Sequence, residues 1–182
     1  MPRQDPTAAR SRRAFLTGAA AALITVQASP GHALPFFRRR QAADTAAERS
    51  LFMLHQRTGE IYHEVYFNGE AYLKDPLDRF AVFARDMRSG TVGEMDPHLL
   101  DLAHDLQQLS GPDTPLILTH GFRAARRGGP AGSHHLTGEA MDITHPELGP
   151  SQLYQLADRL ERGGLGRYRS FIHIDTGPTR RW

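Results

Sequence analysis

Cysteine is absent from this 182-residue sequence, which excludes disulfide bonds and thiolate metal ligands. Any metal ion must therefore be held by histidine, aspartate or glutamate side chains. Long hydrophobic runs are lacking as well. The most apolar stretch, residues 17–26, has about half of the roughly 20 residues that a membrane-spanning helix needs, and its Ala, Gly and Thr content makes it weakly apolar. We expect no other segment to cross a membrane.

The first 33 residues have the features of an export signal. Arg12-Arg13 precedes the weakly apolar stretch, and Gly31-His32-Ala33 then places small residues two apart, as signal peptidase requires. This arrangement predicts export by the twin-arginine route, cleavage after Ala33 and a periplasmic mature protein. We interpret residues 34–49 as a linker and residues 50–182 as a single domain, long enough to bury a hydrophobic core.

An excess of basic charge is missing from the mature part of the chain. The whole sequence has 22 basic and 20 acidic side chains. Residues 1–33 contain four of the arginines and one aspartate, so 18 basic and 19 acidic side chains remain, a net charge of −1. Nucleic-acid binding normally requires a basic surface, and we therefore expect no nucleic-acid partner.

Hydrophobic periodicity and turn residues predict a domain of the α+β class. Asp75-Pro76 and Asp96-Pro97 each open a helix with an aspartate cap and a proline in the first turn. Asn68-Gly69 is the commonest two-residue hairpin turn and predicts an antiparallel meander over residues 51–73. The expected helices are 75–89, 96–109 and 151–162, and the expected strands are 51–54, 61–67, 115–119, 139–144 and 170–175. We therefore predict a small antiparallel sheet that carries the functional site and is packed by helices.

Polar residues of the kind that bind metals occur in and before two of these strands. Side chains alternate along a strand, so Asp142 points away from the face on which Met141 and Ile143 would pack against helices. A carboxylate in that position needs a charged partner. His135 lies in the turn before this strand, and His173 lies in the strand near the end of the chain. Two histidines and one carboxylate form a catalytic zinc set with the fourth position open for water.

Each of these residues also has an ordinary structural interpretation. A histidine in an apolar strand is more often a satisfied core or surface residue than a ligand. An aspartate near a turn is more often a cap or a turn former. Gly138 allows the turn before the strand to fold back tightly, which suits either interpretation. The residue pattern alone therefore leaves both alternatives open.

Five short motifs, spread over the mature chain, add a resemblance to a known family. They are L-x-x-L-H-x-x-T-G-E at 51–60, H-G-F-R at 120–123, S-x-H-x-x-G-x-A-x-D at 133–142, R-G-G-L-G at 162–166, and F-I-H-I-D-T-G-P followed by R-x-W at 171–182. Their order and spacing resemble the LAS metallopeptidases (the lysostaphin, D-Ala-D-Ala and sonic-hedgehog group), and within them the M15-like murein endopeptidases. The resemblance covers essentially the whole mature chain.

The resemblance implies roles for individual residues. His135, Asp142 and His173 match the three ligands of one catalytic zinc ion. Arg123 matches an arginine that holds the substrate carbonyl, where a fixed guanidinium would stabilise the developing oxyanion. A structural ion pair is the alternative role for Arg123. Ser133 has no surrounding triad and is expected to orient the ligand loop.

One residue of the family pattern is missing. Many relatives place Glu or His two or three residues before the last zinc ligand, as a general base, and here those positions are Phe171 and Ser170. Asp175, which shares a strand face with His173, is the nearest acidic candidate for a catalytic base. Its alternative role is to orient His173 or to bind a substrate amine. Three further candidates are His134, Glu139 and His145.

The resemblance implies an exported, zinc-dependent murein endopeptidase that hydrolyses peptide cross-links of peptidoglycan. One alternative is a D,D- or L,D-carboxypeptidase that trims stem peptides, for which Arg126, Arg127 or Arg169 would bind the terminal carboxylate. Another alternative is a non-catalytic wall-binding module on a peptidase fold. The expected partners are peptidoglycan peptides, with no stable membrane span after signal removal, and the sequence leaves the oligomeric state open.

Overall fold

In the part of the chain that the structure describes, seven strands form one sheet. The computed structural model describes residues 47–127 and 132–182, so the predicted export signal and most of the predicted linker lie outside the described residues. The order of strands across the sheet is β2-β1-β3-β4-β6-β5-β7. The strands are β1 (Arg49–His55), β2 (Ile61–Phe67), β3 (Leu116–His120), β4 (Ala140–Thr144), β5 (Gly164–Arg167), β6 (Ile172–Asp175) and β7 (Arg180–Arg181).

The sheet is mixed. Neighbouring strands run antiparallel except for β1 with β3 and β5 with β7, which are parallel. β1 and β2 form the expected hairpin, and the third strand of the expected meander is reduced to a bridge between Phe67 and Tyr72. β3 can run parallel to β1 because the connection between β2 and β3 is long and contains two helices, α1 (Lys74–Phe83) and α2 (Pro97–Ser110). The α+β class is confirmed, in a sheet that is larger than expected and only partly antiparallel.

Of the two predicted aspartate caps, the one at Asp75 is wrong, since α1 begins at Lys74 after Leu73 and has no side-chain cap. The helix that follows the second aspartate–proline pair has the predicted cap. The side chain of Asp96 accepts a hydrogen bond from the backbone N–H of His98 at 2.9 Å, and Pro97 occupies the first helical position. This bond satisfies one of the donors that a helix leaves unpaired at its start. The start of α2 therefore follows from local sequence alone.

The other two helices end earlier than the periodicity predicts. α1 stops at Phe83, because the carbonyl of Ala84 accepts a hydrogen bond from the backbone N–H of Phe122 (2.7 Å) and the chain turns away from the helix axis. α3 (Pro150–Asp158) ends at Asp158, short of the predicted end at Arg162. Glu161, in the turn that follows, adopts a left-handed φ of 52°. Both early ends therefore depend on conformations that apolar spacing does not encode.

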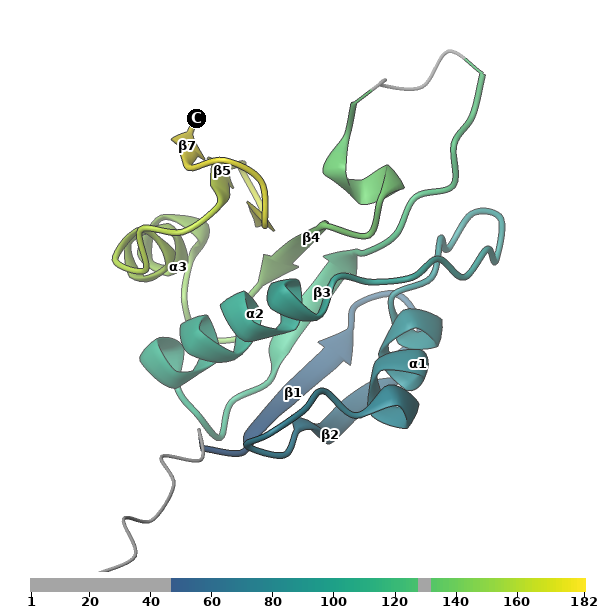
Figure 1. Cartoon of the computed structure of the whole chain (residues 1–182). Helices are drawn as coiled ribbons and strands as arrows, with labels where there is room; N and C mark the ends of the chain where they lie inside the picture. Colours follow the sequence, from purple (N-terminus) through teal and green to yellow (C-terminus); the bar gives the residue numbers. More distant parts are fainter. Residues whose placement is uncertain (1–46, 128–131) are drawn as a thin grey trace, which may run out of the picture. The chain divides into compact units, whose positions relative to one another are not determined.

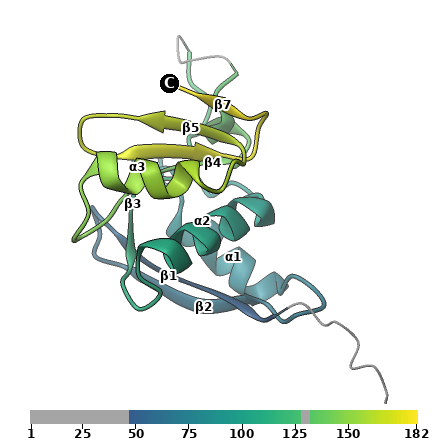
Figure 2. The same cartoon turned by 90° about the vertical axis from the view of Figure 1, so that its left-hand side faces the viewer.

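The three α-helices of the described residues contribute to one apolar core with the sheet. α1 packs on β2, α2 runs from β1 to β6 across the middle of the sheet, and α3 packs on β5 and β6 (Figures 1 and 2). Met141 and Ile143 of β4 and Ile172 and Ile174 of β6 are buried in this core. Alternation therefore turns the residues between them to the other side of the sheet, where the short 3-10 helix η1 (His134–Leu136) packs on β4.

The sequence analysis missed β5 and β7. Glycine is uncommon in β-strands, and β5 contains two glycines in four residues. The structure gives the reason for them: a Cβ atom at Gly164 would lie 2.3 Å from the Asp175 carboxylate, and one at Gly166 would lie 2.4 Å from the Trp182 ring. β5 is thus a strand whose side-chain space is occupied by residues from β6 and the chain end.

Within the described residues, no helix combines the length and the apolar character needed to cross a bilayer.

Candidate metal centre

Three buried side chains converge on the side of the sheet opposite the helices. Asp142 of β4 and His173 of β6 are paired directly across the two strands, and His135 comes from η1. Their ligand atoms all lie within 4.8 Å of one another. Asp142 Oδ1 is 3.2 Å from His135 Nε2 and 2.9 Å from His173 Nδ1, and the two ring nitrogens are 3.3 Å apart. The structure thus brings together the three side chains that the sequence analysis selected as metal ligands.

His135 presents Nε2 to this cluster because its other ring nitrogen already has a partner. Nδ1 lies 2.7 Å from the carbonyl oxygen of Gly121, and a carbonyl can only accept, so Nδ1 carries the proton. The turn before β4 depends on Gly138, whose φ is 73° and whose Cβ would lie 1.9 Å from the carbonyl oxygen of Glu94. The predicted tight turn at Gly138 is confirmed, and it places the His135 ring with its lone pair toward the cluster.

His173 is oriented in the same way by Asp175. Its Nε2 atom lies 2.9 Å from Asp175 Oδ2, and the Asp175 carboxylate, which is fully buried, also accepts hydrogen bonds from Arg180 and from two backbone N–H groups. Burial alone would raise the pKa of Asp175, but the hydrogen bonds and the charge of Arg180 lower it below the usual range. The ionised carboxylate therefore accepts the Nε2 proton, and His173 turns its unprotonated Nδ1 toward the cluster.

Asp142 divides its two carboxylate oxygens between different partners. Oδ1 faces the rings of His135 and His173, whereas Oδ2 lies 2.8 Å from the Arg123 guanidinium and 3.4 Å from His120 Nδ1. Burial alone would raise the pKa of Asp142, but the contact of Oδ2 with His120, together with a proton shared between Oδ1 and the rings of His135 and His173, lowers it well below the usual range. Asp142 is therefore an ionised carboxylate near neutral pH, and Arg123 balances its charge from the outer side.

This donor set fits a divalent metal ion. His135 Nε2, His173 Nδ1 and Asp142 Oδ1 turn lone pairs toward one another at hydrogen-bond distances, yet the protons of both rings are on the opposite nitrogens. Such an arrangement is repulsive unless a cation or an added proton lies between the three atoms. Two imidazoles and one carboxylate suit a tetrahedral zinc ion with one open position, and they also suit other divalent ions.

A pocket of about 310 Å³ opens over the cluster. One part of its wall is aromatic: Tyr168 and Phe171 stack with ring centroids 4.6 Å apart, and the Trp182 ring lies 5.3 Å from the ring of His173. Arg123 forms part of the wall as well. An open metal position would therefore face a space bounded by aromatic rings and a guanidinium group, large enough to admit a segment of peptide.

The two residues predicted to be catalytic occupy different places. Arg123 lines the pocket, and it also forms the ion pair with Asp142 that its alternative role required. Asp175 lies behind His173, on the ring nitrogen that faces away from the cluster. A general base must come within hydrogen-bond reach of the proton that it removes. The geometry therefore favours the orienting role of Asp175 over the base role.

A histidine–glutamate pair lies beside the cluster. His134 lines the pocket, and its Nδ1 atom is 2.8 Å from Glu139 Oε2, which also accepts a hydrogen bond from the Thr137 hydroxyl. These contacts, with that of His134 the largest, lower the pKa of Glu139. The ionised Glu139 accepts the Nδ1 proton, so that Nε2 of His134 is the nitrogen able to take up another. His145 is placed elsewhere, at the end of β4, where its Nδ1 accepts two backbone N–H groups of the next turn.

Several residues of the site were not selected from the sequence. His120 contacts Asp142, Arg180 holds Asp175 at 2.7 Å, and Trp182 covers His173. The two glycines of β5 leave room for Asp175 and Trp182. All of these positions lie inside the five sequence motifs, so the motifs themselves were the signal that could have identified them.

A family model and known proteins with similar sequences all carry the description peptidoglycan L,D-endopeptidase. Residues 43–182 match the model of the family Peptidase_M15_2, described as peptidoglycan L,D-endopeptidase MepK. The chain is 34% identical over 149 residues to a protein of Escherichia coli K12 named peptidoglycan L,D-endopeptidase MepK, covering 76% of this chain and 82% of that protein. It is 28% identical over 150 residues to a Haemophilus influenzae protein named probable peptidoglycan L,D-endopeptidase MepK, covering 76% and 81%.

Proposed function

The chain belongs to the MepK family of M15 peptidases, and we propose that it is a murein endopeptidase that hydrolyses peptide cross-links of peptidoglycan with one zinc ion. The observation that carries the proposal is the cluster of His135, Asp142 and His173 beneath an open pocket. Both histidines have their outer nitrogens tied to acceptors, which leaves the inner nitrogens ready to bind a metal. The relatives are named as L,D-endopeptidases, and we propose the same class of bond for this chain.

The metal ion would supply the electrophile of the reaction. When bound, zinc polarises a scissile carbonyl and lowers the pKa of a water molecule at its open position. The chain's own contribution is to fix the coordinating atoms before substrate arrives, since each ring is already held by a backbone carbonyl or a buried carboxylate.

Arg123 has the role of stabilising negative charge at the substrate carbonyl. Its guanidinium lines the pocket and is anchored on Asp142 Oδ2 at 2.8 Å, while its backbone N–H is bonded to the carbonyl of His135. A guanidinium carries several donors in a fixed plane, so one can remain on Asp142 while others reach the substrate oxygen. This anchoring supports an oxyanion role because it holds the charge in place before the reaction begins.

Proton transfer is assigned to the His134–Glu139 pair. His134 lines the pocket, and Glu139 holds its Nδ1 proton, so that Nε2 can accept a proton and later return it to the leaving amine. Asp175 is assigned the orienting role, because its carboxylate is committed to His173, Arg180 and two backbone N–H groups.

The site of action is the periplasm. Peptidoglycan lies outside the cytoplasmic membrane, and Arg12-Arg13 with the apolar stretch after it is the signal from which we infer export by the twin-arginine route.

The test is digestion of purified, cross-linked peptidoglycan by the protein from residue 34 onward, loaded with zinc, with His135→Ala as control. We expect cross-linked dimers to disappear, the products to identify the bond by mass, and the control to be inactive. Metal analysis of both proteins shows whether the loss follows the metal. Shortened monomer stems with intact dimers would instead indicate a carboxypeptidase. No hydrolysis by the zinc-loaded protein would refute the enzyme and favour a wall-binding module.

A further inference from the structure

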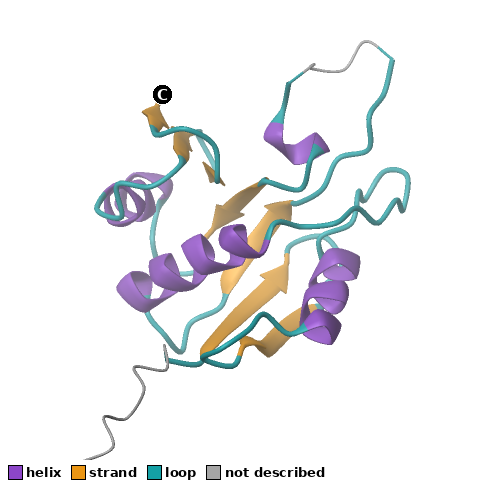
Figure 3. Ribbon diagram, viewed as in Figure 1, coloured by secondary structure: helices purple, strands orange, loops and turns teal. Residues whose placement is uncertain are grey.

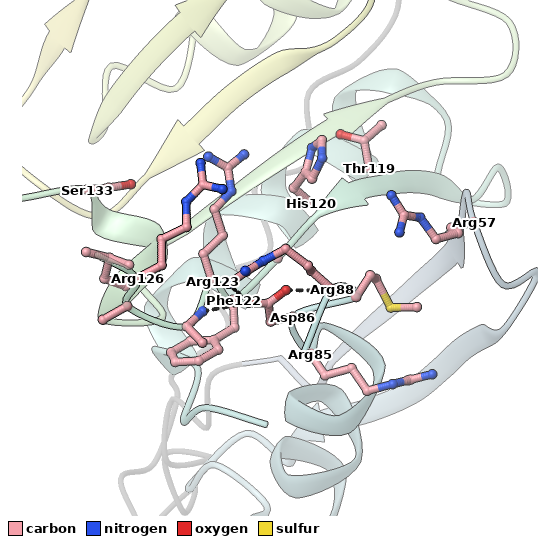
Figure 4. Close-up of a pocket in the computed structure, with 15 residues that line it drawn as sticks. Arg57, Arg85, Asp86, Arg88, Thr119, His120, Phe122, Arg123, Arg126 and Ser133 are labelled. Carbon is pink, nitrogen blue, oxygen red and sulfur yellow. Dashed lines mark hydrogen bonds and ion pairs between the residues drawn. The ribbon is translucent and has the colours of Figure 1, made fainter. Parts of the chain in front are cut away.

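A second pocket, of about 600 Å³, adjoins the metal centre and is rich in arginine. It shares Arg123 and Ser133 with the pocket over the metal ligands. Its wall contains five arginines, which are Arg57, Arg85, Arg88, Arg123 and Arg126, and it also contains His120. Among the described residues that line it, Asp86 is the only acidic one. Figure 4 shows Arg57 on one side of this pocket and Arg123 and Arg126 on the other. We call it the arginine pocket.

The position of the arginine pocket follows from the topology of the sheet. β1 and β3 are parallel neighbours, with His55 paired to Leu118, so the segments that follow them emerge at the same edge. Arg57 follows β1, and residues 121–126 follow β3. The loop after α1 leaves at this end of the domain too (Figure 3). The carboxyl ends of parallel strands are a common place for ligand sites, because loops from separate segments meet there.

A buried carboxylate holds the floor of the arginine pocket in place. Asp86 accepts hydrogen bonds from the backbone N–H groups of Arg88 (2.8 Å) and Ala124 (3.0 Å), which ties the loop after α1 to the segment after β3. The backbone N–H of Phe122 adds a bond to the carbonyl of Ala84 at 2.7 Å. Asp86 therefore holds the floor together, and its single negative charge is opposed by five arginines in the wall of the pocket.

The charges in the arginine pocket are only partly balanced. Arg85 pairs with Glu60 at 2.9 Å and Arg123 pairs with Asp142 at 2.8 Å. Arg88 reaches Asp86 only at 3.9 Å. Within residues 47–127 and 132–182, no carboxylate lies in salt-bridge contact with Arg57 or Arg126. A concave site with excess guanidinium charge attracts anions, and the planar guanidinium matches the geometry of a carboxylate.

We propose that the arginine pocket binds the free carboxylates of the acidic stem peptide on one side of the scissile bond. This inference rests on the proposed function, because it takes the peptide at the metal centre as the substrate. The other side of the metal centre is lined by Tyr168, Phe171 and Trp182, which offer stacking surfaces. Arg180 lies on that side too, but its guanidinium is paired with the buried Asp175 carboxylate at 2.7 Å. The two sides therefore differ in chemistry, and the carboxylate-bearing end of the substrate extends toward Arg57 and Arg126, which act as positioning residues.

The test compares three full-length proteins: the parent chain, the double variant Arg57→Gln/Arg126→Gln, and Arg79→Gln. Arg79 is the matched control, since it lies on α1, pairs with Glu64 and lines neither pocket. Each protein also carries His135→Ala, so that the probe is not consumed during the binding measurement. The probe is a diaminopimelate-containing stem peptide, used with its carboxylates free and with the same carboxylates converted to amides.

We expect the parent to bind the free acid more tightly than the amide, and the double variant to bind the free acid about tenfold more weakly. The amide should bind equally to both, and Arg79→Gln should behave as the parent. In zinc-loaded proteins that retain His135, the double variant should show KM raised about tenfold for cross-linked muropeptides, with kcat within about twofold of the parent.

Two results would overturn the arginine-pocket assignment. In one, the double variant keeps the parent's preference for the free acid and its KM. In the other, Arg79→Gln weakens binding as much as the double variant, which would mean that general surface charge is responsible. Failure of the proposed function has a different signature, since the zinc-loaded parent would then leave all cross-links intact while the binding comparison still tests the pocket.

Discussion

Two buried aspartates, one on α2 and one on β4, differ in what surrounds them. Asp101 of α2 is 6% exposed and accepts hydrogen bonds from the hydroxyls of Tyr66 (3.0 Å) and Tyr72 (2.5 Å), with Arg49 at 2.9 Å. Asp142 of β4 is 2% exposed and faces two imidazoles on one oxygen. Burial is nearly the same, and both carboxylates have a lowered pKa despite it.

The difference lies in the protons of the partners. Tyrosine hydroxyls and a guanidinium donate to Asp101, so its charge is satisfied by the protein itself. The rings around Asp142 have their protons fixed on the far side, by Gly121 and by Asp175. A buried carboxylate has a structural role where its neighbours donate to it, and it is a candidate metal ligand where its neighbours present lone pairs.

The largest effect is expected from Asp142→Asn. The change preserves the shape of the side chain but removes the charge that Arg123 and the proposed metal ion require. We expect metal content to fall and cross-link hydrolysis to drop by at least about 100-fold. Mutation of residues that only hydrogen-bond to a metal ligand already lowers metal affinity or activity by about 10–100-fold. Metal analysis and muropeptide separation by mass measure both effects. Full activity with bound zinc in this variant would show that Asp142 is not a ligand.

Asp175→Asn should have the next largest effect. The amide fits the same space, but it cannot act as a charged acceptor for both His173 and Arg180, so the tautomer of His173 is no longer held. We expect zinc to bind about 10–100-fold more weakly, as measured by competition with a chelator. If Asp175 were instead the general base, zinc affinity would stay at the parental value and only the hydrolysis rate would fall.

Asp101→Asn tests the other half of the comparison. Removal of the charge leaves the two tyrosine hydroxyls and Arg49 without their carboxylate, and we expect the free energy of unfolding to fall by about 2 kcal/mol. Zinc affinity and activity of the folded protein should stay unchanged, because Asp101 makes no contact with the metal ligands. Urea denaturation measures the stability, and a parallel loss of zinc would mean that the Asp101 cluster and the candidate metal centre are coupled.

The smallest effect concerns two histidines that cap the turns after β1 and β4. His55 Nδ1 accepts the backbone N–H groups of Arg57 and Thr58, and His145 Nδ1 accepts those of Glu147 and Leu148. Burial lowers the pKa of both. As the pH falls, the two histidines therefore become protonated in the unfolded chain before they do so in the folded protein. The stability that the neutral imidazoles contribute is full above about pH 6.5 and is lost as the pH falls toward the lowered pKa.

Asn can accept the same N–H groups without titrating. His145→Asn should therefore lose less stability than the parent as the pH falls below about 6.5. Urea denaturation at a series of pH values gives the comparison, and it cancels the titration of groups that both proteins share. Parallel curves for the two proteins would contradict the proposed role of the neutral imidazole.

Local patterns predicted those parts of the fold that local energies decide. The cap at Asp96, the hairpin of β1 and β2, the alternation in β4 and the turn at Gly138 are all as expected. These features depend on residues within a few positions of one another, so periodicity and turn chemistry are sufficient to find them. β5, β7 and the early end of α1 were missed, because each depends on a partner distant in sequence.

The sequence by itself predicted the set of metal ligands, because the resemblance of its motifs to a metallopeptidase family selected His135, Asp142 and His173 where the residue pattern alone left the structural alternative open. It also determined which face of β4 packs on helices. Only the tertiary structure favours the orienting role of Asp175 over the base role, since that preference depends on which ring nitrogen of His173 it contacts. The arginine pocket has the same origin: its residues lie far apart along the chain, and the parallel pairing of β1 with β3 brings them to one edge.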